Sequence, residues 1–176
     1  MNMRKADGFA LIDMIFVCGI IGILCSIGMP KLIMAKQSAG AASAIGSMRA
    51  ISSSQLTYAL TCGGGFYAND LTRLGTNPPG SNESFIKGGL GSASTVTKAG
   101  YIIQMTAAPY PGSPASCNGA AVGDGGQGFK ASADPTGPTG TRFFAINANG
   151  AIFEDTATLW ATMPQFGDPP SGHPLR

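Results

Sequence analysis

The chain has 176 residues, a length that fits one domain with a sizeable core. Its residues are 44% hydrophobic and only 11% charged, which is sparing of charge for a soluble protein. The formal net charge of +2 comes from scattered Lys and Arg, which form no basic stripe for a phosphate backbone. We therefore expect no nucleic-acid partner. Glycine and proline concentrate after residue 62, which predicts turns and short strands there.

The first predicted element is an apolar segment, residues 9–29, which is broken by one ionisable side chain, Asp13. As a helix it would measure roughly 31 Å, about the hydrocarbon thickness of a bilayer. Arg4 and Lys5 precede the segment and Lys31 follows it, a modest asymmetry that favours a cytoplasmic N-terminus. The segment is therefore predicted to cross a membrane once, with the bulk of the chain on the outer side.

Three ordinary kinds of apolar N-terminal segment compete with this interpretation. A secretory signal peptide has a small-residue site near Ser26, but Asp13 inside the run and Pro30 just beyond the cut argue against it. A lipoprotein signal needs a small residue before its cysteine, whereas Leu24 precedes Cys25. A plain anchor leaves Asp13 unexplained, because a carboxylate in the apolar region costs up to about 3 kcal/mol.

The residues around Asp13 form a motif that explains the carboxylate. A short basic leader ends in Gly8, and Phe9, Ala10-Leu11-Ile12 and the acidic residue follow. This motif resembles the recognition site of type IV prepilins and type II secretion pseudopilins. The resemblance implies that residues 1–8 are a leader peptide, that a prepilin peptidase cuts between Gly8 and Phe9, and that the new amino terminus of Phe9 is methylated.

In that family the acidic residue, here Asp13, pairs with the terminal amine of a neighbouring subunit during assembly. A buried carboxylate without a partner would be costly, but an ammonium opposite it supplies a charge-assisted partner and so fixes the register between subunits. The family normally has glutamate at this position, so the shorter aspartate is expected to pair more weakly or at closer approach. The resemblance continues with "IIGIL" at 20–24 and with Pro30, where a helix kink or local melting is expected.

An amphipathic helix is predicted beyond Pro30, ending at the Cys62-Gly-Gly-Gly run. A single helix from Phe9 to about Thr61 would be roughly 80 Å long. The predicted apolar face consists of Ala41, Ala44, Ile45, Met48 and Ile51, extended by Leu56, Ala59 and Leu60, and the other sides carry Lys36, Ser43, Ser47 and Ser54.

The rest of the chain is predicted to form a small antiparallel sheet. Residues 63–98 are interpreted as loop, and strands are predicted at 101–106, 128–132, 142–146 and 151–155. Asn149-Gly150 between the last two predicts a hairpin. The fold class is therefore α+β and pilin-like, with a long N-terminal helix, apolar in its first half and amphipathic in its second, packed on the sheet. The expected packing partners of the helix are Tyr101, Phe129, Phe143 or Phe144, and Ile152.

The four cysteines fall into two environments. Cys18 and Cys25 lie two helical turns apart in the apolar segment and are interpreted as small hydrophobic residues at a helix interface. Cys62 and Cys117 lie outside it, and in an oxidising compartment we expect them to form a disulfide, worth about 4 kcal/mol by loop-closure entropy.

Signals for catalysis and for cofactors are weak. The one histidine, His173, lies in a Pro-rich tail that is expected to be mobile, and Glu154 and Asp155 point to opposite faces of a strand. The glycine-rich segments lack the Gly-Lys-Ser/Thr of a phosphate cradle, and "GDGGQG" at 123–128 offers too few oxygen ligands for calcium. We therefore predict no catalytic residue, no metal site, no cofactor and no enzyme activity.

The resemblance covers nearly the whole chain, because "KAGYI" and "TGTRFFAINANGAIFED" also look like strands of pilin-like proteins. It implies a structural subunit of a type IV pilus-like filament, stored as a single-pass inner-membrane protein with a cytoplasmic N-terminus. Residues 9–29 would be the transmembrane and filament-core half of the helix, and residues 30–176 its amphipathic half and an extracytoplasmic head.

The partners that the resemblance implies are a prepilin peptidase, identical or related subunits, an inner-membrane assembly platform and membrane lipid. After assembly the subunit would lie in a pilus or in a periplasmic pseudopilus. Two alternatives stay open: a pseudopilin of a type II secretion system, and a membrane-anchored extracytoplasmic binding module.

Overall fold

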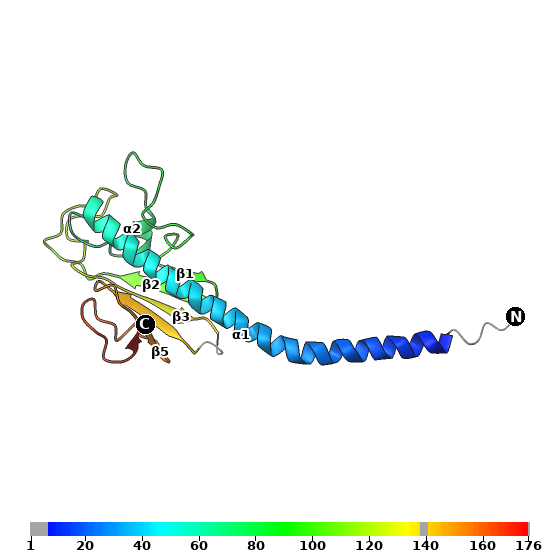
Figure 1. Cartoon of the computed structure of the whole chain (residues 1–176). Coiled ribbons are helices and arrows are strands. Elements are labelled where there is room, and N and C mark those ends of the chain that lie inside the picture. Colours follow the sequence, from blue (N-terminus) through cyan, green and yellow to red (C-terminus); the bar gives the residue numbers. More distant parts are fainter. Residues whose placement is uncertain (1–6, 138–140, 176) are drawn as a thin grey trace. The chain divides into compact units, whose positions relative to one another are not determined.

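The structure, a computed structural model, describes the backbone of residues 7–137 and 141–175, and side chains within these ranges from Leu11 onward. Helix α1 (Asp7–Thr61) is followed by the short helix α2 (Leu71–Gly75) and, within the described residues, by one sheet of six antiparallel strands (Figure 1). The strands pair in chain order as β1 (Thr95–Lys98), β2 (Tyr101–Thr106), β3 (Lys130–Pro135), β4 (Phe143–Asn147), β5 (Ile152–Asp155) and β6 (His173–Pro174). The chain divides into two units, Met1–Ala39 and Gly40–Arg176.

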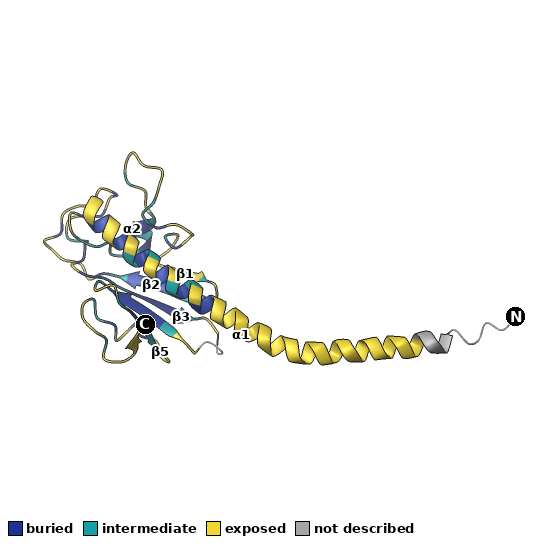
Figure 2. Ribbon diagram, in the orientation of Figure 1, coloured by how far each residue is buried: buried dark blue, intermediate teal, exposed yellow. Residues whose placement is uncertain are grey.

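The described part of the first unit is a helix without a core of its own. Every side chain of residues 11–39 is exposed, and Figure 2 shows this part of α1 uniformly as exposed. The helix continues through Pro30 without interruption, so a kink or melting at Pro30 stays a prediction. The predicted apolar first half of the long helix is confirmed.

The part of α1 in the second unit buries one stripe. The stripe recurs at spacings of three and four, as a helix packed on one side requires, and consists of Ala41, Ala44, Met48, Ile51, Gln55 and Tyr58. Cys62, which directly follows the helix, is also buried. The prediction that Leu56 and Leu60 belong to the buried face is wrong, because Leu56 is 55% exposed and Leu60 is 76% exposed. Ser47 and Ser54, predicted on the other sides, are buried, and the Ser47 hydroxyl donates to the Ser43 carbonyl oxygen.

The sheet supplies the apolar surface that covers this stripe. The alternation of buried and half-buried residues along β2 places Tyr101, Ile103 and Met105 in the core. The same cluster contains Phe129, Ala131, Ala133, Phe144, Ile146 and Ile152. The expected packing partners are thus confirmed, with Phe144 as the buried residue of the Phe143–Phe144 pair.

The opposite face of the sheet is covered by the chain itself. Leu159 and Met163, from the segment after β5, form a second core cluster with Ala145 and Phe153. Asn147 fixes the end of this segment by donating to the carbonyl oxygens of Pro164, at 3.2 Å, and Gly167, at 2.6 Å. The expectation of a mobile tail is wrong where β6 pairs with β5. Leu175 N–H also donates to Ile152 O, and the Leu175 side chain is half-buried against the core.

Residues 63–98 contain more regular structure than the loop that was predicted. Asp70 caps α2 by accepting a hydrogen bond from Arg73 N–H at 2.8 Å. At the end of the region, β1 pairs with β2, because Thr95-Val96-Thr97 is a β-branched run that can complete the sheet edge. The predicted hairpin between β4 and β5 is confirmed, and Gly150 adopts φ 80° in its turn.

Candidate functional site

The apolar stretch of α1 is the first candidate site. By length and composition this is the one helix of the described residues able to cross a membrane, with none of its apolar window buried. Its exposed large side chains include Leu11, Ile15, Phe16, Ile20, Ile23, Leu24, Ile27 and Leu32. A surface of this kind is stable only against lipid or against other apolar helices.

Asp13 is the acidic group of this stretch, and its side chain is exposed. It makes no hydrogen bond or ion pair with any other described residue. The predicted cleavage position, Gly8–Phe9, lies in the helical range of α1, but its side chains are outside the described residues, as are residues 1–6 of the predicted leader. Cleavage, methylation and the pairing of Asp13 therefore stay predictions.

The predicted disulfide between Cys62 and Cys117 is present, with 4.9 Å between the two Cα atoms. It joins the end of α1 to the loop before β3, and Cys117 N–H also donates to Cys62 O at 3.2 Å. Cys18 and Cys25 are free and exposed. The bridge fixes one end of the second unit, where helix α1 stops at Cys62-Gly63-Gly64.

Gln55 is a buried polar residue that sequence reasoning missed. Its side chain is fully buried, accepts a hydrogen bond from Ala68 N–H at 2.8 Å and donates to Ala68 O at 2.9 Å. Its amide nitrogen also lies 3.0 Å from Met105 Sδ. The helix thus holds the extended segment that follows the disulfide, and a polar residue in phase with the apolar stripe is the signal that could have indicated this contact.

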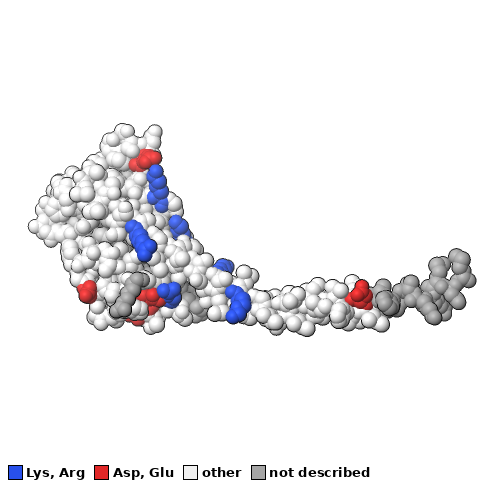
Figure 3. Space-filling view, viewed as in Figure 1, with Lys and Arg blue, Asp and Glu red and all other residues white. Residues whose placement is uncertain are grey.

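The charged side chains of the second unit are scattered, as the face drawn in Figure 3 shows. Arg142 binds Glu154 through both carboxylate oxygens, from Nε to Oε1 and from Nη2 to Oε2 at 2.8 Å. This hydrogen bonding lowers the pKa of Glu154 below its ordinary value. Of the titratable residues weighed for catalysis, Glu154 is thus held in an ion pair with Arg142, and His173 is its neighbour in the register between β5 and β6.

Asp134, at the end of β3, is in a less favourable environment. Burial raises the pKa of its carboxyl group, although the hydrogen bond that Thr158 Oγ1 donates at 2.7 Å lowers it. Its other oxygen, Oδ1, is buried without a partner among the described residues. Nearby, Lys130 Nζ donates to Trp160 O at 2.7 Å and lies 5.0 Å from the centre of that indole ring. These contacts hold the segment after β5 on the sheet.

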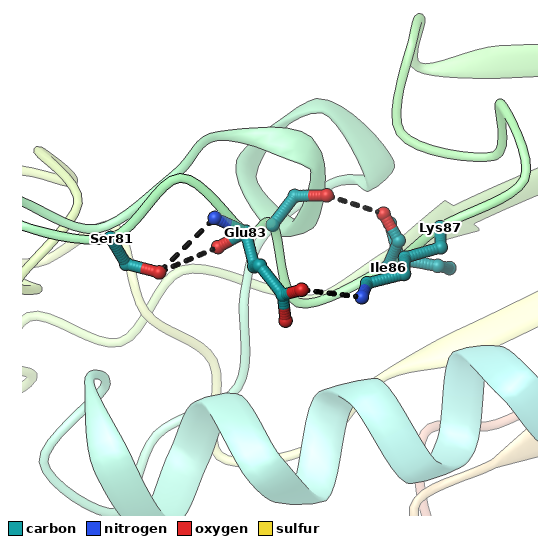
Figure 4. A network of polar contacts seen from close by, with 5 residues as sticks. Ser81, Glu83, Ile86 and Lys87 are labelled. Carbon is teal, nitrogen blue, oxygen red and sulfur yellow. Dashed lines mark hydrogen bonds and ion pairs between the residues drawn. The ribbon is translucent and has the colours of Figure 1, made fainter.

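A polar hollow lies in the chain between α2 and β1. Its volume is about 490 Å³, and its side chains are mostly polar: Asn77, Asn82, Glu83, Ser84, Lys87 and Ser92. Figure 4 shows part of its wall, where the Glu83 carboxylate faces the Lys87 ammonium at 3.1 Å. From the sequence this stretch is interpreted as loop, and no site is predicted there.

No family model, characterised protein or solved structure matches this chain.

Proposed function

We propose that this chain is a structural subunit of a type IV pilin-like filament, held in the inner membrane by helix α1 before assembly. The observation that carries the proposal is the exposed apolar stretch of residues 11–29, with the carboxylate of Asp13 near its start. The motif at Gly8–Phe9 supplies the expected cleavage position.

The apolar side chains of this stretch are more stable when they are shielded from water. Removing one large apolar side chain from water contributes about 1.5–3 kcal/mol, and this stretch exposes many of them. Lipid can provide that cover before assembly, and the same helices from neighbouring subunits can provide it afterwards. One surface thus serves both storage and cohesion.

Asp13 distinguishes a filament subunit from a plain anchor. In lipid an unpaired carboxylate costs about 3 kcal/mol, and a plain anchor has no partner that would offset this cost. Cleavage after Gly8 would create an ammonium on Phe9, four residues before Asp13. An ammonium and a carboxylate of adjacent subunits then meet in one register only, because any other register leaves both charges unpaired in apolar surroundings.

The second unit fits the outer surface of such a filament. It has its own core of helix, sheet and covering segment, and the Cys62–Cys117 disulfide suits an oxidising compartment outside the cytoplasm. Its loops and the outer strands would then face solvent.

The test compares Asp13→Ala, Asp13→Asn and Asp13→Glu in cells that produce the protein naturally. We expect the first two variants to reach the membrane at normal levels but to be depleted from sheared filaments at least about tenfold, whereas Asp13→Glu is incorporated. Lys36→Ala, an exposed charge of the same unit, is the matched control and should assemble normally.

Normal incorporation of Asp13→Ala would contradict the proposal and favour the membrane-anchored module. The abundance of the wild-type chain separates the other alternative, since a pilus subunit dominates sheared surface filaments and a pseudopilin is scarce in them.

A further inference from the structure

The dipeptide Asn-Gly occurs twice in the chain, as Asn118-Gly119 in the loop before β3 and as Asn149-Gly150 in the turn between β4 and β5. This dipeptide has a chemistry of its own, because the backbone nitrogen that follows an asparagine can attack the carbon of the side-chain amide. Glycine has no side chain to hinder that approach. The fold places these two copies of one motif in opposite environments.

Asn118 is buried and its side chain is held by hydrogen bonds. Only 6% of the residue is exposed. Its amide nitrogen donates to Arg73 O at 2.7 Å and to Thr76 O at 3.1 Å. Its amide oxygen accepts from Ser116 Oγ at 2.8 Å. Both hydrogens of the amide are therefore in use, and the nitrogen cannot leave unless both of its bonds break.

Asn149 is exposed at the turn of the β4–β5 hairpin. Its side-chain nitrogen makes no hydrogen bond with another residue in the part of the chain that the structure describes. A Cβ atom built at Gly150 would meet nothing within 4 Å apart from its chain neighbours, so the space beside the turn is open to water. The amide nitrogen of Asn149 is therefore free to leave.

The side-chain oxygen of Asn149 has one hydrogen-bond donor, the N–H of Gly167, at 3.2 Å. Negative charge develops on this oxygen when a nucleophile attacks the amide carbon. A main-chain N–H that already points at the oxygen stabilises that charge, as the donors of an oxyanion hole do. The segment after β5 thus supplies a group that favours attack at Asn149.

The attacking nitrogen is restrained by the turn in both copies of the motif. Gly150 N–H donates to Asn147 O at 2.9 Å, and Gly119 N–H donates to Ser116 O at 3.3 Å. This bond must open before the nitrogen can react. At the exposed hairpin turn it can open locally without disturbing the core. The restraint is common to both sites, so the difference between them lies in the asparagine side chains.

We propose that Asn149 is a modification site at which the folded protein deamidates spontaneously through a cyclic imide, whereas Asn118 is protected. The Gly150 nitrogen loses its proton and forms a bond to Asn149 Cγ, and the Cγ–Nδ2 bond breaks, so that the amide nitrogen leaves as ammonia. Water then opens the ring. Its attack on the side-chain carbonyl gives aspartate, and its attack on the backbone carbonyl gives isoaspartate. The reaction involves no oxidant or reductant, and the inference does not depend on the filament function.

The modification changes the turn in two ways. Both products carry a negative charge that asparagine lacks, and isoaspartate also adds one carbon to the main chain between β4 and β5. Gly167 is held at this turn by Asn149, which accepts from its N–H, and by Asn147, which donates to its carbonyl oxygen. The longer main chain displaces the first of these partners. Isoaspartate at position 149 therefore loosens the end of the segment that follows β5.

The experiment incubates the full-length chain in micelles at neutral and at mildly alkaline pH and follows both asparagines by peptide mass spectrometry. Isoaspartate is identified with a protein isoaspartyl methyltransferase. In the folded chain we expect Asn149 to react at least about tenfold faster than Asn118, which is the effect of the two hydrogen bonds that hold the Asn118 amide nitrogen. In denaturant the two rates should become similar, because glycine follows each asparagine.

Two matched variants identify the attacking nitrogen. An added methyl group hinders the nitrogen, so Gly150→Ala should slow the reaction of Asn149 and leave that of Asn118 in denaturant unchanged. Gly119→Ala should do the reverse. Gly150 has φ 80° and Gly119 has φ 94°, so alanine strains the turn at either position. The comparison is therefore made in denaturant, where neither variant has to fold.

Three results would overturn the proposal. The first is a reaction of Asn149 in the folded chain that is no faster than that of Asn118. The second is a ratio of the two rates that is the same in folded and unfolded chains, because the sequence and not the fold would then be its source. The third is the absence of isoaspartate, which would exclude the cyclic imide.

Discussion

Gln55 and Ala68 bind one another in both directions, with the side-chain oxygen of Gln55 accepting from Ala68 N–H and its nitrogen donating to Ala68 O. The pair joins the buried face of helix α1 to the segment that follows the disulfide. The next residue, Asn69, accepts a hydrogen bond from Ala107 N–H just beyond β2, so one glutamine aligns helix, connecting segment and sheet.

Replacing Gln55 by Met tests the energetic weight of this pair. Methionine keeps the volume but leaves the buried Ala68 N–H and C=O unpaired, so we expect the free energy of unfolding to fall by about 3 kcal/mol. Chemical denaturation of the full chain in micelles measures the change. The neighbouring exposed variant Leu56→Ala is the control, and it should stay within about 0.5 kcal/mol of the wild type. Equal stability of the two variants would contradict the account.

Gln55 also shows why part of the fold escaped prediction. The buried stripe passes through position 55, where the polar residue interrupts the apolar pattern, so counting apolar residues selected Leu56 and Leu60 instead. The partner that makes Gln55 acceptable in a core is the Ala68 backbone, which no local pattern reveals. The stripe from Ala41 to Ile51 was predicted correctly because its residues are apolar and keep one helical phase.

The sheet shows the same division between local and tertiary information. The β4–β5 hairpin was predictable because Asn149-Gly150 specifies its turn locally. Strand β6 was not, since a Pro-rich segment forms a strand only when an existing edge, here β5, is available to it. The polar hollow was missed for a related reason, because the contact between Gly75 and Gly91 that closes its loop joins residues far apart in sequence.

The disulfide should contribute strongly to the stability of the second unit. Replacing both Cys62 and Cys117 by Ser is expected to lower the free energy of unfolding by about 4 kcal/mol, because the unfolded chain regains the entropy of an open loop. Replacing both Cys18 and Cys25 by Ser is the matched control and should leave the denaturation midpoint of this unit unchanged. Alkylation of the unfolded protein without reductant should label Cys18 and Cys25 only, and labelling of Cys62 or Cys117 would contradict the bridge.

The Arg142–Glu154 pair predicts a dependence on pH with a definite sign. Because the pair lowers the pKa of Glu154 in the folded state, its contribution is complete above the ordinary value of 4.5 and is lost as pH falls through the lowered value. Glu154→Gln should therefore lower the melting temperature at pH 7 and have little effect in strong acid. A difference from the wild type that is the same at both pH values would show that the ion pair is not its source.

Asp134 predicts the opposite dependence. Its pKa is raised by burial, so stability from this group is greatest below the ordinary value of 3.8 and is lost as pH rises through the raised value. Asp134→Asn, which keeps an acceptor for Thr158 and removes the charge, should raise the melting temperature at pH 7, and the gain should disappear in acid. Asp168→Asn, at an exposed position, is the control and should change the melting temperature neither at pH 7 nor in acid. A lower melting temperature for Asp134→Asn at pH 7 would contradict this interpretation.

The central claim, that the chain is processed as a prepilin, is tested most directly by mass spectrometry of the N-terminal peptide from native membranes. The account predicts a mature chain that begins at N-methylated Phe9, with Asp13 as its fifth residue. A chain that still carries residues 1–8 in cells with an active prepilin peptidase would contradict it, and so would a chain that begins near Met29.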